Sequence, residues 1–99
     1  MKVLITGRTG FLGRHLSKHI KKLGWDIFES NTKTANLMCD KNLHIYNDLK
    51  FDYIFHLAAH TKAGDYCLHH KGEQFEINQR INSNILKYWN DKQRQAKLV

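Results

Sequence analysis

Three glycines near the N-terminus have the spacing of a loop that can hold a phosphate group. Gly7, Gly10 and Gly13 follow the apolar run at 3–5 and open a segment of helical periodicity. The first glycine would permit a tight exit from the strand, the second a close approach of the backbone to a pyrophosphate, and the third close packing of the helix against the sheet. Free amides and the helix dipole would hold the charge. The spacing predicts a dinucleotide site; the alternative is a glycine-rich turn without ligand.

Strands and helices alternate around this loop. Continuous apolar runs predict strands at 2–6, 26–30 and 53–57, and the start of another at 96–99. Helical periodicity predicts helices at 11–23, 40–49 and 73–90. This alternation predicts parallel pairing through right-handed crossovers. We therefore expect an α/β fold, the first half of a Rossmann-type sheet with strand order 3-2-1-4 and helices on both faces.

The helix after the loop is expected to bury one apolar stripe. Residues at helical spacing form it, namely Leu12, Leu16, Ile20 and Leu23. Gly24 is expected to end the helix as a C-terminal cap. Four basic residues lie off the stripe and are expected to point to solvent: Arg14, Lys18, Lys21 and Lys22.

Length and composition are those of one small globular domain. The chain has 99 residues, 41% apolar and 25% charged. No apolar run approaches the roughly 20 residues needed to cross a bilayer, and the apolar stretch at the start is too short for a signal peptide. We therefore expect a cytoplasmic protein without membrane contact. Cys39 and Cys67 lie far apart and are expected to be reduced thiols.

The chain is basic, with a formal net charge of +7. Such a surface attracts polyanions, and nucleic acid is one candidate partner. The basic residues are, however, spread from Lys2 to Lys97 without a dense block. We therefore do not expect nucleic-acid binding, because an anionic cofactor and substrate account for the charge equally well.

Four segments share the pattern of one protein family. They are the 3–13 segment, with glycines at its seven-residue spacing, the Phe55-His56-Leu57-Ala58-Ala59 run, Asn36-Leu37, and Asn78 with Asn84-Ile85-Leu86. Together they resemble the extended short-chain dehydrogenases/reductases, specifically the NAD-dependent epimerase/dehydratase family. Within that family the arrangement is most similar to sugar-nucleotide enzymes of the GDP-fucose synthase kind.

The resemblance implies a role for each segment. The pyrophosphate would be cradled by backbone groups of Gly7, Gly10, Phe11, Leu12 and Gly13. Leu37 would pack near the adenine with Asn36 as a polar neighbour. The small-residue turn would lie under the ribose and nicotinamide, and comprises Leu57, Ala58 and Ala59. Tight packing is the alternative role for the two alanines, and both roles can hold at once.

The choice between NAD and NADP depends on the end of the second strand. Many NAD-binding members carry an acid there that grips the ribose diol. In this chain that position falls on Asn31, and Glu29 is expected to point elsewhere. Arg8 and Lys33 would instead meet a 2′-phosphate, which favours NADP slightly over NAD. Solvated surface charge is the alternative for both.

The family's catalytic residues are not recognisable here. They are a Ser or Thr and a Tyr-x-x-x-Lys pair after the fourth strand, where the lysine lowers the tyrosine pKa. Tyr88 and Lys92 have that spacing but precede the expected fourth strand. We interpret Tyr88 as a packing residue and expect no catalytic residue in the chain.

Two groups of residues have types that bind metals. His15 and His19 are four residues apart on one helix, without an evident third ligand. Cys67, His69 and His70 lack the spacing of a closed zinc site. We expect no metal: the first pair is interpreted as structural, and by the resemblance the second segment lies on the substrate side.

The resemblance implies that residues 1–99 are an NAD(P)-binding Rossmann domain, truncated at the fourth strand. It would be the amino-terminal part of an epimerase, dehydratase or reductase acting on a nucleotide sugar. The alternative is a stand-alone nucleotide-binding or regulatory module without catalysis. An open apolar sheet edge would favour pairing between chains, so the isolated chain is expected to be either marginally stable or a homo-oligomer.

Overall fold

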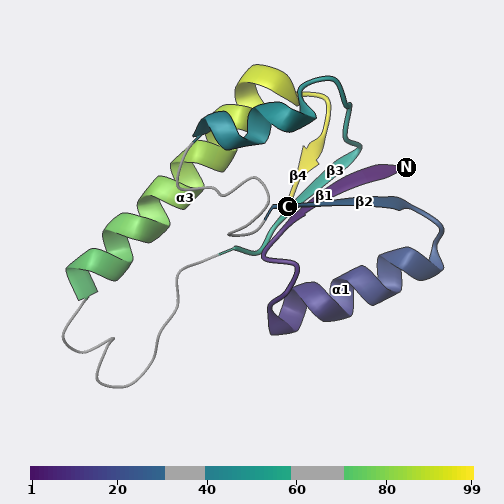
Figure 1. Ribbon diagram of the computed structural model, residues 1–99, viewed down its shortest axis with the longest axis horizontal. Helices are drawn as coiled ribbons and strands as arrows, with labels where there is room; N and C mark the ends of the chain where they lie inside the picture. The colour runs from purple at the N-terminus through teal and green to yellow at the C-terminus, as the bar shows by residue number, and fades with distance from the viewer. Residues whose placement is uncertain (31–39, 59–70) are drawn as a thin grey trace.

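The computed structural model describes residues 1–30, 40–58 and 71–99 (Figure 1). The sheet is built from β1 (Lys2–Thr6), β2 (Asp26–Ser30), β3 (Tyr53–His56) and β4 (Lys97–Leu98). Its helices are α1 (Phe11–Lys22), the 3-10 helix η1 (Asp40–Tyr46) and α3 (Lys71–Lys92). The predicted alternation of strands and helices is therefore confirmed. The largest difference in bounds is at 40–49, where the helix is shorter and of the tighter 3-10 form.

All strand pairs in the described sheet are parallel, in the order β2-β1-β3-β4. In the register, Val3 lies between Ile27 and Tyr53. The α/β class and the parallel sheet are thus confirmed. The strand β4 is short: Lys97 and Leu98 pair with β3, and Val99 adds backbone hydrogen bonds to Ile54 and His56.

The predicted strand order 3-2-1-4 is wrong. It placed the 53–57 strand outside the second strand, whereas β3 pairs with the opposite edge of β1. The chain reverses its direction of travel at β2, crosses back over β1, and continues outward to β4. A right-handed crossover in the reverse direction must run over the other face of the sheet. Accordingly β3 takes the place that the doubly wound order gives to a fourth strand.

The reversal produces a core on each face of the sheet. Alternation along β1 sends Val3 and Ile5 toward Ile20 of α1, and sends Leu4 toward the cluster with Leu43 and Ile85. Figure 1 shows α1 on one side of the strands and α3 with η1 on the other. The expectation of helices on both faces is confirmed.

The predicted stripe on α1 is only partly right. Leu12 and Leu23 are 61% and 52% exposed, whereas the residues buried on the helix are Gly13, Ser17 and Ile20. The buried line lies one residue beyond the predicted stripe at Gly13 and Ser17 and coincides with it at Ile20. Gly24 has a φ of 77° and follows the last turn, as expected for a helix end.

A buried glutamine holds the second core together. The amide oxygen of Gln93 accepts the Phe51 N–H at 3.0 Å, and its nitrogen donates to the Leu49 carbonyl at 2.7 Å and to the Tyr88 hydroxyl at 3.0 Å. Tyr88 is 3% exposed, and burial raises the pKa of its hydroxyl. The interpretation of Tyr88 as a packing residue is confirmed.

Replacing Gln93 by leucine should destabilise the chain, because the Phe51 N–H and Leu49 carbonyl lose a buried partner. Each unsatisfied group costs about 1–3 kcal/mol. Urea unfolding of the Gln93→Leu chain should show the loss. Gln79→Leu makes the same change at an exposed position of α3 and should have little effect. Equal midpoints for the two variants would contradict the role given to Gln93.

Candidate dinucleotide-binding site

The carboxyl ends of β1 and β3 lie side by side in the sheet, at the point where the chain changes its direction of travel. In open parallel sheets, ligands bind in the crevice outside the strand ends at such a switch point. The glycine loop follows β1, and Leu57 and Ala58 follow β3. The fold thus brings together two of the segments that the sequence predicted to share a site.

Gly7 is required by the fold. Its φ of 72° lies in the left-handed region that side chains disfavour. A Cβ atom on it would also lie 2.8 Å from the Ala58 nitrogen and 2.8 Å from the Leu57 carbonyl carbon. The backbone leaving β1 therefore presses directly on the backbone leaving β3.

Gly13 is required by the same turn. A Cβ atom here would overlap the Gly7 carbonyl oxygen and lie 2.7 Å from the Arg8 Cα. The close packing predicted for this glycine is present. Its partner is the turn between β1 and α1, whereas the sequence pattern pointed to the sheet itself.

Gly10 is different, because the chain itself does not require a glycine there. Its φ and ψ of −71° and 174° suit any residue, and a Cβ atom would meet only the Gly7 carbonyl oxygen, at 3.4 Å. The residue is exposed. Its missing side chain leaves open space in front of the first turn of α1.

The start of α1 carries no protein anion. Gly10 offers no side-chain cap, the first turn contains no acidic residue, and the first helical bond runs from the Arg14 N–H to the Gly10 carbonyl at 2.9 Å. The side chains of Phe11 and Leu12 are 74% and 61% exposed. Any ligand held here would meet the backbone amides and the positive end of the helix dipole.

Thr6 is a site residue that the sequence reading missed. Its hydroxyl oxygen accepts the N–H groups of Leu57 and Ala58, each at 3.0 Å, and lies 2.8 Å from Nδ1 of His56. Both lone pairs are used, so the hydroxyl proton points to Nδ1. The available signal was a hydroxyl residue that closes an apolar strand directly before the first glycine.

The same chain of hydrogen bonds reaches α3. Because Nδ1 of His56 accepts, we assign the ring proton to Nε2, which donates to Oδ1 of Asn82 at 2.7 Å. Leu57 packs on the α1 side of the sheet and Ala58 on the α3 side. The packing role considered for Ala58 is therefore present. Five further predicted positions lie outside the described residues: Asn31, Lys33, Asn36, Leu37 and Ala59.

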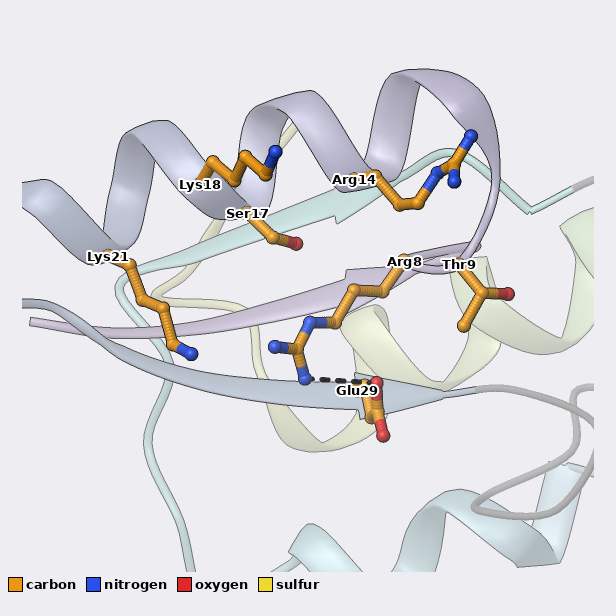
Figure 2. Close-up of a pocket in the computed structure, with 7 residues that line it drawn as sticks. All are labelled: Arg8, Thr9, Arg14, Ser17, Lys18, Lys21 and Glu29. Carbon is orange, nitrogen blue, oxygen red and sulfur yellow. Dashed lines mark hydrogen bonds and ion pairs between the residues drawn. The ribbon is translucent and has the colours of Figure 1, made fainter.

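Arg8 forms an ion pair with Glu29 of β2, at 3.1 Å between guanidinium and carboxylate. Both side chains are 31% exposed. Alternation from Ile27 places Glu29 on the α1 face, beneath the loop that carries Arg8, and this parity could have revealed the pair from sequence. Figure 2 shows the pair at the floor of a pocket of about 390 Å³ between α1 and β2.

The other groups singled out in the sequence add no chemistry to this site. The ring of His15 makes an edge contact with Phe11, with ring centroids 4.6 Å apart. No group of three metal-ligating side chains occurs within 1–30, 40–58 and 71–99. Cys67, His69 and His70 lie outside those ranges. In the same part of the chain, no helix has the length and apolar character needed to cross a membrane.

A family model described as the NAD dependent epimerase/dehydratase family matches residues 3–99. The chain belongs to this epimerase/dehydratase family. Among solved structures, the dTDP-4-dehydrorhamnose reductase of Clostridium acetobutylicum is 25% identical, with a TM-score of 0.81 over 99% of this chain. The match covers 34% of the reductase, so this epimerase/dehydratase chain spans about a third of that relative.

Two further structures share the fold and hold a cofactor. The dTDP-4-dehydrorhamnose reductase of Bacillus anthracis, in complex with NADP, is 24% identical with a TM-score of 0.82, covering 98% of this chain and 34% of its own. The GDP-L-fucose synthetase of Naegleria fowleri, bound to NADP, is 24% identical with a TM-score of 0.72, covering 91% and 27%. At this identity both similarities concern the fold of the epimerase/dehydratase chain.

Thr6→Val should destabilise the chain, because it keeps the shape of the side chain and removes the acceptor for two backbone N–H groups. We expect a loss of about 1–3 kcal/mol in the free energy of unfolding, measured in urea. The matched control is Thr9→Val, the same change at an exposed threonine three residues later. A Thr6→Val chain as stable as this control would contradict the role of the hydroxyl.

Proposed function

We propose that this chain binds NADP or NAD through the glycine loop, as the cofactor-binding part of an enzyme that acts on a nucleotide sugar. Gly10 carries the proposal, because a glycine that the fold does not need stands beside an uncapped helix N-terminus at the switch point. The pyrophosphate occupies the space in front of it. Amides of Phe11, Leu12 and Gly13 supply the hydrogen bonds.

The rest of the cofactor follows from the ends of the strands. The nicotinamide half lies over Leu57, Ala58 and Ala59, whose small alanines leave room for it. Asn36 and Leu37 border the adenine. When bound, the cofactor supplies hydride transfer to or from the sugar. This chain's own part is to bind and orient the cofactor, since it contains no recognisable catalytic residue.

NADP is the preferred cofactor in this proposal. Asn31 has no charge to repel a 2′-phosphate. Arg8 supplies a positive charge close to the end of β2, where it pairs with Glu29. The ion pair with Glu29 keeps Arg8 in place, and the phosphate competes with Glu29 for the guanidinium. The NADP-bound relatives support this choice.

Gly10→Val should weaken cofactor binding without unfolding the chain. The backbone at Gly10 suits a side chain, but the added methyl groups occupy the space assigned to the pyrophosphate. We expect affinity to fall by more than about tenfold, or about 1.4 kcal/mol. Calorimetry with NAD, NADP and their reduced forms measures this, with circular dichroism as the test of folding. Wild-type binding no tighter than that of the variant would refute the proposed site.

Charge changes at the ion pair should alter cofactor choice in opposite directions. Arg8→Gln should lower the NADP-to-NAD affinity ratio by about tenfold, because it removes a charge-assisted hydrogen bond to the 2′-phosphate. Glu29→Gln should raise the ratio, because Arg8 loses its competitor. Arg94→Gln, an exposed change remote from β2, is the control. Equal ratios in all of these chains would exclude Arg8 as the phosphate ligand.

A further inference from the structure

The pocket beneath α1 extends away from the switch point. Its lining includes Arg8 and Glu29, and also Ser17 and Lys21 from later turns of the helix. At about 1.5 Å per residue, Lys21 lies roughly 15 Å along the axis from the first residue of α1. Ser17 and Lys21 have no part in the proposed contacts of the glycine loop with the pyrophosphate.

A buried hydroxyl in the pocket has no partner in the described part of the chain. Ser17 is 6% exposed, and its Oγ makes no hydrogen bond among those residues. A serine within a helix commonly donates to the carbonyl four residues earlier. An unpaired buried hydroxyl costs about 1–3 kcal/mol. Figure 2 shows this hydroxyl pointing from α1 into the space above the strands, toward the side chain of Arg8.

The lining of the pocket is strongly cationic. Among the described residues that line it, Glu29 is the one carboxylate, and it already pairs with Arg8. Three more cations come from α1, a helix without any acidic residue: Arg14, Lys18 and Lys21. None of these three forms an ion pair within 1–30, 40–58 and 71–99. Figure 2 shows Lys21 reaching from α1 toward β2, on the side of the pocket where Arg8 lies.

We propose that this pocket binds a phosphate-type oxyanion, with Ser17 and Lys21 as its direct ligands. Lys18 and Arg14 raise the positive potential at its mouth. An oxyanion accepts a hydrogen bond from the unpaired Ser17 hydroxyl and also compensates the positive charges of the lining. A water molecule can accept the hydrogen bond but cannot compensate the charges. The pocket is open to solvent and, at about 390 Å³, has room for a small oxyanion. Its two direct ligands lie outside the glycine loop, although Arg8 and Thr9 of that loop also line the pocket. Binding at Ser17 and Lys21 can therefore be tested independently of the proposed function.

The test is a titration of the 99-residue chain with inorganic pyrophosphate at constant ionic strength, followed by calorimetry and by the shift in thermal midpoint. The titration is repeated with the Gly10→Val chain, in which the added side chain blocks pyrophosphate binding at the glycine loop. We expect binding to persist in that chain. Loss of all binding with Gly10→Val would overturn the separate site.

Variants on one helix assign the ligands. Lys21→Gln and Ser17→Ala should each weaken pyrophosphate binding about fivefold or more. Without ligand, Ser17→Ala should be at least as stable as the wild type, because it removes an unpaired polar group. Lys22→Gln is the matched control, since it removes the same charge from the adjacent, exposed residue. Equal losses of pyrophosphate affinity in Lys21→Gln and Lys22→Gln would mean that the overall charge of the helix, and not a specific contact, is responsible, and would overturn the proposal.

Competition distinguishes the two sources of phosphate. A free oxyanion should bind equally well in the presence of saturating NADP or NAD. Displacement by NADP but not by NAD would mean that the pocket receives the cofactor's own 2′-phosphate, and would also overturn a second site.

Discussion

The contact between the backbone leaving β1 and the backbone leaving β3 is the constraint on which the rest of the molecule depends. Gly7 permits it, and the Thr6 hydroxyl fixes it by accepting two N–H groups from the facing chain. The same turn then receives Gly13, which sets how closely α1 lies on the strands. One set of short backbone contacts thus determines how the chain leaves β1, how closely α1 packs on the sheet, and the shape of the crevice at the ends of the strands.

Local patterns in the sequence predicted the elements and the phosphate loop, because these depend on neighbours along the chain. The strand order could not be read in this way. An apolar run at 53–57 indicates a buried strand but not which edge of β1 it joins. That choice depends on the direction of the crossover, and thus on which face η1 and α3 cover. The order predicted from the alternation of strands and helices was wrong for this reason.

In the candidate site too, features that depend on sequence neighbours were predicted, whereas features that depend on distant contacts were not. The glycines were found because their spacing is local, whereas Thr6 and Glu29 act through partners 21 to 52 residues away. The apolar stripe of α1 misled for a related reason. Leucine at position 12 satisfied the helical period, but close packing at Gly13 rotated the buried line toward Ser17. The pocket that includes this serine was therefore not predicted from the sequence.

The three glycines of the loop differ in what selects them. Selection for folding alone would remove a substitution of Gly7 or Gly13, because a side chain at either position would overlap fixed backbone atoms. At position 10 the folded chain does not require a glycine, so under the proposed function it is the bound cofactor that would maintain the residue. In a lineage where that use had ended, position 10 would drift first while the fold persisted. Under the proposed function, the identity of residue 10 would therefore report whether the loop still binds a ligand, whereas residues 7 and 13 report only the requirements of folding.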